Sequence, residues 1–388
     1  MNLVYTEVPK GSMIQAFGIP RYLRKEGSVQ SATGPTGEKK SFNMNKLDRR
    51  IAVAPMMDWT DRHCRFFLRG FSPHTLLYTE MITAAAITRG DAARLLAYDP
   101  EEHPLALQLG GSDPRELAAA ARIGEQAGYD EINLNCGCPS DRVASGAFGA
   151  CLMLEPARVA ECVAAMSAAV RIPVTVKMRI GVLSGTRSEL AGTLARFDEP
   201  DFEALHEFVR LSAQAGSRVA IVHARKAVLG GLSPKDNREV PPLHYEVVRR
   251  LKSCFPALPV ILNGGLRTAE AVLEALGWCD GVMLGREAYH RPMLLSQLHE
   301  ALYPQEPAVQ RRALLERMAC YAEQRLAEGH SLSSVTRHML GLCTGEPGAR
   351  EYRRVLSEGA RQSGADAGLI RRVAAAVVHP VEPDASAA

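Results

Sequence analysis

The chain has 388 residues, of which 46% are hydrophobic and 23% are charged, a balance typical of a folded globular protein and not of a disordered, collagenous or disulfide-rich one. The formal net charge is only +3, so overall charge does not indicate a nucleic-acid-binding protein, and any contact with RNA must be local. The nine cysteines form no CxxC pair, which is typical of reduced thiols in a reducing compartment. No apolar run approaches the roughly 18 residues of a membrane span. We therefore expect a cytoplasmic protein without a membrane segment.

Residues 1–43 are rich in Gly, Ser, Pro, Thr and Lys and show no hydrophobic period, which predicts a disordered N-terminal extension. Met44 directly precedes the first apolar run. The extension is therefore interpreted either as a functional arm or as a segment upstream of the true translation start.

From Ile51 onward, eight short apolar runs are each followed by a helical pattern. The runs cover residues 51–55, 75–79, 105–109, 131–135, 174–178, 219–223, 259–263 and 281–284. Runs that are apolar throughout are typical of parallel strands covered on both faces. Eight strand-helix units in about 240 residues predict an α/β protein with a (β/α)₈ TIM barrel over residues 44–303, and a doubly wound open sheet is the alternative.

Beyond Pro304 the strand-like runs stop and amphipathic helical patterns continue, for example through Leu314, Met318 and Tyr321. They predict a small C-terminal helical-bundle domain over residues 304–380, followed by a tail at 381–388.

Polar residues and glycines follow nearly every predicted strand. In a barrel these positions converge at one mouth, where burying a polar group without a partner is costly. Hydrogen bonding to local backbone explains any one of them but not the whole set, so we expect a functional site there. The set comprises Pro55, Met56, Met57, Glu80, Gln108, Asn135 to Cys138, Lys177, Arg179, His223, Arg225, Asn263, Gly264, Gly265, Gly285 and Arg286.

The last two strand exits indicate a phosphate site. Asn263-Gly264-Gly265 and Gly285-Arg286 each lead into a predicted helix. Glycines let backbone N–H groups approach a phosphate, and a guanidinium can bind two of its oxygens. The alternative is a pair of tight turns with a surface arginine.

Lys177, together with Gln108 and Met56, suits a flavin ring. An ammonium group near the N1/C2 carbonyl stabilises negative charge on reduced flavin, and an amide hydrogen-bonds the ring edge. FMN is the favoured flavin because it carries one phosphate and no GxGxxG follows the first strand.

Cys138 lies just after the fourth run, on a loop bent by Gly137 and Pro139. A thiol is mostly protonated at neutral pH and can act as a general acid toward a carbanion or enolate. The alternatives are a thiolate nucleophile, which would need an adjacent base, and a metal ligand. We expect no metal, because the cysteine spacing matches no zinc or iron–sulfur pattern. We expect Cys136, Cys162, Cys254 and Cys279 to fill apolar space.

These residues resemble a known family. Ile132-Asn133-Leu134-Asn135-x-Gly137-Cys138-Pro139, followed by Gly149-Ala150-Cys151-Leu152-Met153, is similar to the hallmark of the tRNA-dihydrouridine synthases. Segments 54–61, 78–81, 107–111, 222–226 and 231–239 resemble the A-type bacterial branch, and the likeness runs from about Met44 to about Val378.

The resemblance implies an oxidoreductase that reduces the C5=C6 bond of uridine to 5,6-dihydrouridine at positions 20 and 20a of the tRNA D-loop. It implies bound FMN, NADPH as reductant, hydride transfer from flavin N5 to C6, and protonation of C5 by Cys138. Among the strand-exit residues, those that match the flavin-contacting motifs by position are Pro55, Met56, Met57, Gln108, Lys177, His223, Asn263, Gly264, Gly265, Gly285 and Arg286. The positions matched to tRNA contacts are Asn135, Lys235, Arg238, Arg350 and Arg353, and for the last two the alternative is a solvated helix face, since Glu346 and Glu351 interleave.

Two departures from the family stand out. Cys136 replaces the usual aliphatic residue, which leads to the hypothesis of a redox-sensitive thiol beside the catalytic one. The loop over residues 183–198 is longer than the usual connection, and its role is open.

Two other functions compete with this interpretation. A barrel that binds FMN and a free pyrimidine, as in dihydroorotate dehydrogenases, is disfavoured by the arginines after Pro304. A non-catalytic tRNA-binding protein is disfavoured by Cys138, Lys177 and His223 together. We expect a monomer, and no feature indicates a protein partner.

Overall fold

The computed structural model describes residues 47–139, 148–186, 188–190 and 192–377. The predicted extension at 1–43 and the predicted tail at 381–388 lie outside the described residues. No helix in the described part of the chain is both long enough and apolar enough to cross a membrane.

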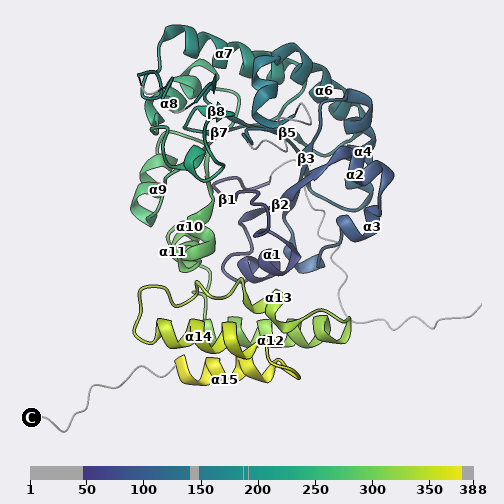
Figure 1. Ribbon diagram of the computed structural model, residues 1–388, viewed down its shortest axis with the longest axis vertical. Helices are drawn as coiled ribbons and strands as arrows, with labels where there is room; N and C mark the ends of the chain where they lie inside the picture. Colours follow the sequence, from purple (N-terminus) through teal and green to yellow (C-terminus); the bar gives the residue numbers. More distant parts are fainter. Residues whose placement is uncertain (1–46, 140–147, 187, 191, 378–388) are drawn as a thin grey trace, which may run out of the picture. The chain divides into compact units, whose positions relative to one another are not determined.

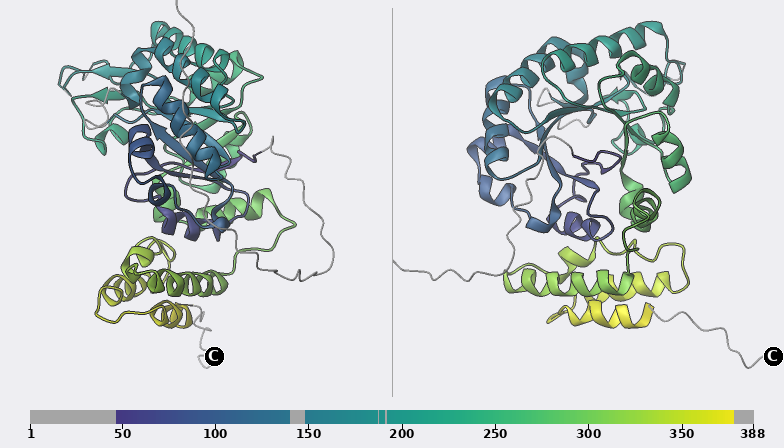
Figure 2. Two further views of the ribbon diagram at one scale, coloured as in Figure 1. Left: turned by 90° about the vertical axis from the view of Figure 1, so that its right-hand side faces the viewer. Right: turned by 180° about the vertical axis from the view of Figure 1, so that it is seen from behind.

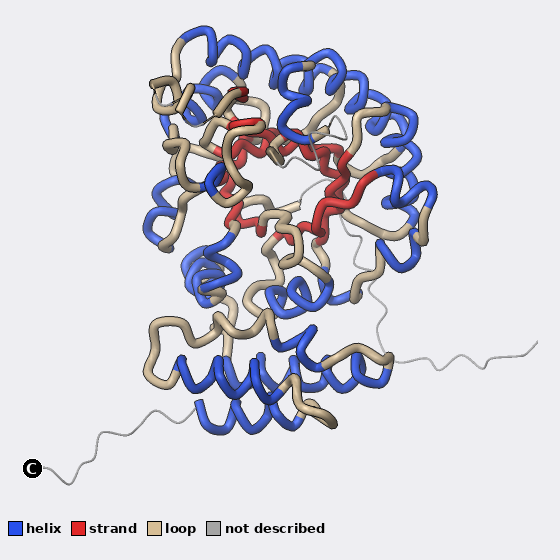
Figure 3. The backbone as a smooth tube through the Cα atoms, in the orientation of Figure 1, coloured by secondary structure: helices blue, strands red, loops and turns tan. Residues whose placement is uncertain are grey.

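Eight parallel strands close into a barrel, which appears as a ring in Figure 3. Around the ring the order is β1-β10-β9-β7-β5-β4-β3-β2. Pairing of β1 with β10 closes the barrel, so the predicted TIM barrel is confirmed and the open sheet is wrong. The strands are β1 (Ile51–Val53), β2 (Leu76–Thr83), β3 (Leu105–Gly110), β4 (Glu131–Cys136), β5 (Val174–Arg179), β7 (Ala220–His223), β9 (Val260–Asn263) and β10 (Gly281–Leu284).

The observed strands follow the apolar runs closely, with two differences. Strand β2 continues to Thr83 because its register against β3 shifts between Tyr78 and Met81, which places Glu80 inside the strand and not at its exit. A second, two-stranded sheet pairs β6 (Val182–Ser184) with β8 (Ala227–Leu229). This small sheet was not predicted, because each strand has only three residues and lies in a loop.

Helices surround the barrel, as Figures 1 and 2 show. The stripe predicted on α6, formed by Val159, Cys162, Val163 and Met166, is fully buried. The helices are α1 (Arg62–Arg69), α2 (Ala84–Arg89), α3 (Ala92–Leu95), α4 (Pro114–Gln126), α6 (Pro156–Ala169), α7 (Glu199–Gln214), α8 (Tyr245–Cys254), α9 (Ala269–Leu276), α10 (Arg286–His290) and α11 (Met293–Leu302), with 3₁₀ turns η1 (Pro100–Glu102), η2 (Gly149–Leu154) and η3 (Asp236–Arg238).

Four further helices follow the barrel: α12 (Arg311–Ala327), α13 (Leu332–Thr336), α14 (Ala349–Gly359) and α15 (Gly368–Val377). The predicted apolar stripe of α12 is buried, including the tyrosine at position 321. Tyr321 hydrogen-bonds His63 of α1 at 2.8 Å, and His338 pairs with Asp61, the N-cap of α1, at 3.0 Å. The described residues all belong to one compact unit, which is not divided at residue 303. The predicted domain boundary between residues 303 and 304 therefore stays a prediction.

A buried carboxylate stands at the start of β4. Glu131 is fully buried, and its carboxylate pairs with Arg49 and accepts hydrogen bonds from Tyr78 at 2.6 Å and Thr175 at 2.5 Å. Burial, reinforced by the charge of Glu131, raises the pKa of Tyr78 well above its usual value, so the phenol stays a donor. Glu131 thereby joins the segment before β1 to strands β2 and β5.

The polar chain continues from this carboxylate toward the carboxyl ends of the strands. Thr175 accepts a hydrogen bond from Nδ2 of Asn133 at 2.9 Å, and Oδ1 of Asn133 accepts one from Nε2 of Gln108 at 2.8 Å. Oε1 of Gln108 in turn accepts a bond from Asn135 at 3.3 Å. Because all three amides are buried, each bond restricts the rotamer of the next side chain.

We expect Glu131→Ala to lower the free energy of unfolding by roughly 3–5 kcal/mol, because it leaves the Arg49 guanidinium and two hydroxyl groups buried without their acceptor. Urea denaturation measures the change. Glu203→Ala, on the exposed face of α7, is the control and should cost less than about 0.5 kcal/mol. Equal losses in the two variants would contradict this assignment.

Candidate active site

The parallel register brings the predicted polar residues onto neighbouring strands at one end of the barrel. Asn135 pairs with Lys177, and His223 lies between Arg179 and Asn263 in the ladder. Because alternate side chains point into the barrel, these residues face the interior at its carboxyl end. The sequence prediction that they share one mouth is therefore consistent with the strand register.

Asn135 shapes the loop that carries Cys138. Its Oδ1 accepts hydrogen bonds from the backbone N–H groups of Gly137 at 2.9 Å and Cys138 at 3.1 Å. The carbonyl of Cys138 accepts a bond from the N–H of Ala150 at 2.9 Å. A Cβ atom at Gly137 would lie 3.3 Å from the backbone of Met178, so glycine lets the loop pass close to β5. Cys138 is partly exposed at the end of this turn.

Two cations lie on β5 beside this loop. Burial, aided by the charge of Arg179, lowers the pKa of Lys177 to about 8. Burial also lowers the pKa of Arg179 to about 10, and Arg179 remains a cation at neutral pH. The charge of the thiol group of Cys138, once ionised, would interact favourably with both cations.

Arg179 has a structural role that sequence reasoning missed. Its guanidinium donates to the carbonyls of Gly137 at 3.3 Å, Lys226 at 3.3 Å and Asn237 at 2.9 Å. It thus ties the Cys138 loop to the segment after β7. The sequence did contain one indication of this role. Arg179 follows Lys177 by two residues, so both side chains lie on the same face of β5.

His223 stays neutral at the mouth. Burial and the nearby charges of Arg179 and Lys177 lower its pKa well below the usual value. Within the described residues, its buried Nδ1 has no hydrogen-bond partner. A neutral imidazole with an unsatisfied buried nitrogen can donate or accept one hydrogen bond from a bound ligand.

The predicted phosphate corner has glycines in the left-handed region, Gly264 at φ 112° and Gly265 at φ 75°. A Cβ at Gly265 would lie 2.3 Å from Cδ1 of Leu243, so a side chain is excluded. Asn263 donates to the carbonyl of Met283 at 2.7 Å and thereby joins β9 to β10. These contacts hold the turn after β9 beside the turn after β10.

Gly285 caps α10, and Arg286 is the first residue of that helix. The guanidinium of Arg286 pairs with Glu239 at 2.6 Å. Arg286 therefore has an acidic partner that a bound phosphate would have to replace or share.

The predicted flavin-contacting segment after β1 is a tight turn. The N–H of Met56 donates to Oγ1 of Thr60 at 2.9 Å, and Asp58 adopts a left-handed conformation with φ 64°. This turn leaves Met57 56% exposed, next to the buried end of β1 that Pro55 and Met56 extend. Met57 is therefore available for contact with a ligand.

Lys235 and Arg238 are both exposed, on the segment around η3. Between them, buried Asn237 exchanges hydrogen bonds with the backbone of Val228 at 2.7 and 2.9 Å. Asn237 lies in segment 231–239, which resembles the family, but the sequence assigned it no role. It anchors the segment on β8, and this leaves its two basic neighbours at the surface.

Arg350 and Arg353 lie one turn apart on α14 and are exposed. Arg354 instead pairs with Glu351 and Glu358. In the part of the chain that the structure describes, neither Arg350 nor Arg353 has an ion-pair partner, and no hydrogen bond links them to the barrel mouth. They form a basic surface of their own.

The remaining cysteines follow the prediction except at one position. Cys136, Cys162 and Cys279 are buried, but Cys254 is exposed, so its prediction is wrong. Cys254 ends α8, where the helix no longer packs on the barrel. Cys136 belongs to the same buried cluster as Cys162. Burial raises the pKa of the Cys136 thiol well above its usual value. A buried thiol with a raised pKa disfavours the hypothesis of a redox-sensitive cysteine.

The loop after β5 also has a described part. Leu190 and Leu194 pack with Val228 in a small cluster of their own. Leu190 and Leu194 of segment 183–198 thus lie against β8, while residues 187 and 191 lie outside the described residues. Its functional role stays open.

The structure is a closed parallel barrel that carries the Cys138 loop, a lysine and a histidine at its carboxyl mouth. The protein is thus a (β/α)₈-barrel protein with a candidate active site at that mouth. The family model described as Dihydrouridine synthase (Dus) matches residues 52–377, and the chain belongs to that family.

Its relatives are tRNA-dihydrouridine(20/20a) synthases. The chain is 54% identical over 323 residues to the one of Xanthomonas axonopodis pv. citri, covering 83% of this chain and 92% of that protein. It is 56% identical over 312 residues to the one of Pseudomonas aeruginosa, with 80% and 90% covered. It is 50% identical over 330 residues to the one of Vibrio vulnificus, with 84% and 97% covered.

Lys177 predicts a pH dependence of the unliganded protein. Its folded pKa of about 8 lies below the ordinary lysine pKa of 10.5, so the unfolded chain binds more protons between these pH values, and stability rises with pH through this window. We expect the free energy of unfolding of the wild type, relative to Lys177→Met, to rise by up to about 3 kcal/mol from pH 8 to 10.5. Denaturant titrations across that range measure it.

Lys235→Met is the control for this comparison because that lysine is exposed. Groups far from Lys177 titrate alike in all three proteins and cancel in the differences. Arg179, whose charge interacts with that of Lys177, contributes to the difference in the same window. If the difference in the free energy of unfolding between wild type and Lys177→Met did not change with pH, the lowered pKa of Lys177 would be contradicted.

Proposed function

We propose that the protein reduces the C5=C6 bond of uridine to 5,6-dihydrouridine at positions 20 and 20a of the tRNA D-loop. The observation that carries the proposal is the Cys138 loop, held by Asn135 beside Lys177 at the mouth of the barrel. The names of the curated relatives support the same substrate.

The residues present fit FMN. His223 offers an unsatisfied buried Nδ1, and Lys177 offers a cation on the neighbouring strand for the electron-rich edge of the ring. Gly264 and Gly265 adopt the left-handed conformations of a tight turn, whose backbone N–H groups would bind a phosphate that Arg286 would hold as a fork. Pro55, Met56, Met57, Gln108, Asn263 and Gly285 complete the proposed set around the ring and its phosphate chain.

The chemistry divides into a hydride and a proton. FMN held by these residues and reduced by NADPH would supply the hydride, from its N5 to C6 of the uracil. The S–H group of Cys138 gives its proton to C5, so that the two hydrogens saturate the double bond. The thiolate left behind faces Lys177 and Arg179, whose charges stabilise it until a proton returns.

A uridine must leave its stack to reach this mouth. Lys235 and Arg238 are exposed beside it and would bind the phosphates flanking the extruded nucleotide. Asn135 is proposed to contact the substrate as well as to shape the loop. Arg350 and Arg353 on α14 would bind a second part of the tRNA.

The tRNA substrate is favoured over a free pyrimidine because α14 presents two arginines without acidic partners among the described residues. As part of the same proposal, the enzyme acts as a cytoplasmic monomer.

The first experiment is an absorption spectrum of the purified holoprotein, followed anaerobically by NADPH and then by unmodified tRNA. We expect flavin bands that bleach with NADPH and return with tRNA. In Cys138→Ala the return with tRNA should slow by about 10²–10⁴-fold, the usual contribution of a general acid, while bleaching by NADPH is unchanged.

Cys254→Ala is the control because its thiol is exposed at the end of α8. A protein that binds tRNA but cannot be reconstituted with FMN would overturn the enzyme proposal. Equal reoxidation rates in wild type and Cys138→Ala would overturn the assignment of the acid.

The basic surface of α14 gives a separate prediction. In Arg350→Ala/Arg353→Ala we expect weaker tRNA binding and a slope of log K against log salt that is smaller by about 1.5, because each lost phosphate contact contributes about 0.7–0.9. Fluorescence anisotropy across a KCl series measures both. Arg354→Ala, whose guanidinium pairs with Glu351 and Glu358, should keep the wild-type slope. The same slope in all variants would place the tRNA elsewhere.

A further inference from the structure

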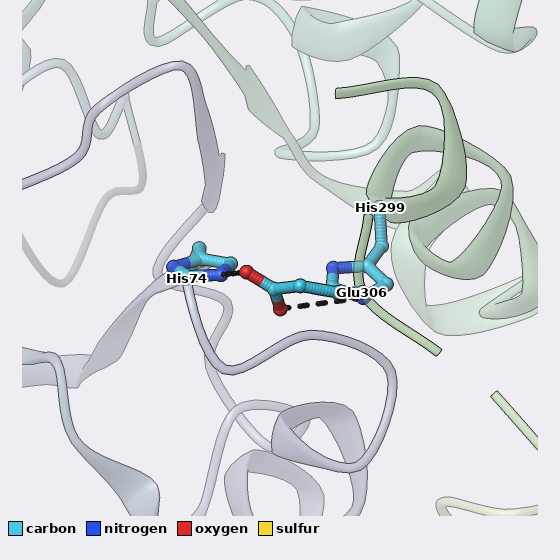
Figure 4. Close-up of side chains that lie close together, drawn as sticks. All are labelled: His74, His299 and Glu306. Atoms are coloured by element: carbon cyan, nitrogen blue, oxygen red, sulfur yellow. Dashed lines mark hydrogen bonds and ion pairs between the residues drawn. The ribbon is translucent and has the colours of Figure 1, made fainter. Parts of the chain in front are cut away.

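Two histidines and a glutamate meet near α12, and Figure 4 shows their three side chains. His74 precedes the amino end of β2, so the cluster lies away from the carboxyl mouth. His74 lies in the loop before β2, His299 on α11, and Glu306 in the segment between α11 and α12. Their closest ligand atoms all lie within 4.8 Å of one another. The proposed tRNA reaction uses none of the three.

From this cluster we propose a binding site for a divalent transition-metal ion, with zinc as the reference ion. Two imidazoles and one carboxylate are a ligand set that zinc takes in proteins, with water in a fourth position. The Nε2 of His74 lies 2.6 Å from Oε1 of Glu306, and the Nε2 of His299 lies 3.7 Å from Oε2. Tetrahedral ligands at zinc bond lengths are about 3.4 Å apart. A small rotation of the Glu306 carboxylate therefore brings all three into range.

His299 is the buried member of the cluster. Its side chain is only 3% exposed, and its Nε2 is the ring nitrogen that lies 3.7 Å from Glu306. Within the described residues its buried Nδ1 has no hydrogen-bond partner. The ring therefore presents Nε2 toward Glu306 from the protein interior.

The His74 ring is already oriented for coordination. It stacks on Tyr303, with centroids 3.9 Å apart and planes at 20°, and the hydroxyl of Tyr303 donates to Asp48 at 2.6 Å. These contacts hold the ring so that its Nε2 faces Glu306, as Figure 4 shows. A ring held by packing loses little freedom when it binds a metal ion.

The site also has access to solvent. His74 and Glu306 are 33% and 38% exposed, and a cavity of about 310 Å³ borders His299 and Glu306. Ser72, Gln310 and Arg317 also line the cavity. An ion and its water ligand can therefore enter without unfolding of the segment. A bound ion would tie this segment, which leads into α12, to the loop before β2.

The test uses Co²⁺ as a spectroscopic probe on the full-length protein, in a Cys254→Ser/Cys320→Ser background that removes the two exposed thiols. At pH 7.5 we expect one Co²⁺ per chain, with the intense visible bands of four-coordinate cobalt and no thiolate charge-transfer band. Affinity should fall by more than about 100-fold in His74→Asn and in Glu306→Gln, beyond the 10–100-fold that changes of outer-shell partners usually cost. Zinc should displace the cobalt.

His103→Asn is the matched control, since His103 also pairs with a carboxylate, Asp130, at 2.6 Å but belongs to no third-ligand cluster among the described residues. It should bind Co²⁺ like the wild type. Melting temperatures with and without zinc provide a second readout, because a ligand that binds the native state raises its stability. Zinc should raise the melting temperature of the wild type and of His103→Asn. It should leave those of His74→Asn and Glu306→Gln unchanged.

Absence of cobalt binding, or equal binding in wild type, His74→Asn and Glu306→Gln, would overturn the proposal and leave an ion pair between His74 and Glu306. The far-UV circular dichroism of each variant without metal establishes that it is folded. Neither readout involves flavin or tRNA, so the outcome is independent of the proposed function.

Discussion

The buried carboxylate of Glu131 is the interaction on which the interior of the barrel depends. A charge that is fully removed from water must be paired, and Glu131 obtains partners from three other parts of the chain, Arg49, Tyr78 and Thr175. Those bonds orient Thr175, which orients Asn133 and through it Gln108. Side chains at the mouth are therefore held by a continuous series of buried hydrogen bonds that starts at the other end of β4.

The mouth itself depends on a cation whose role is mainly structural. Arg179 bonds three backbone carbonyls and so joins the Cys138 loop to the segment that presents Lys235 and Arg238. In the described part of the chain no carboxylate pairs with Arg179 or Lys177, and this net positive charge also lowers the pKa of His223. Two cations on the strand beside a neutral imidazole suit an anionic ligand and a developing thiolate. Fold stability and the proposed chemistry thus share the same residues.

How far the fold could be predicted depended on the length and burial of each segment. The barrel strands were readable because strands covered on both faces are apolar throughout, and the α6 stripe because one helical face packs on the sheet. Sheet β6–β8 was missed because three-residue strands carry no period, and the register shift in β2 depends on its pairing with β3. Cys254 was misplaced because residue type alone does not show where a helix leaves the core.

By itself the sequence determined the fold class, the strand exits, the loop that carries Cys138 and the likeness to one family, since each is written in local periodicity or in a contiguous motif. Tertiary structure decided what no local pattern contains. It separated Arg353, without an acidic partner among the described residues, from the paired Arg354, and it gave Asn135 the task of shaping a loop. It also brought His74 to Glu306, 232 residues away. Such contacts follow from strand closure and helix packing, which act between residues that are distant along the chain.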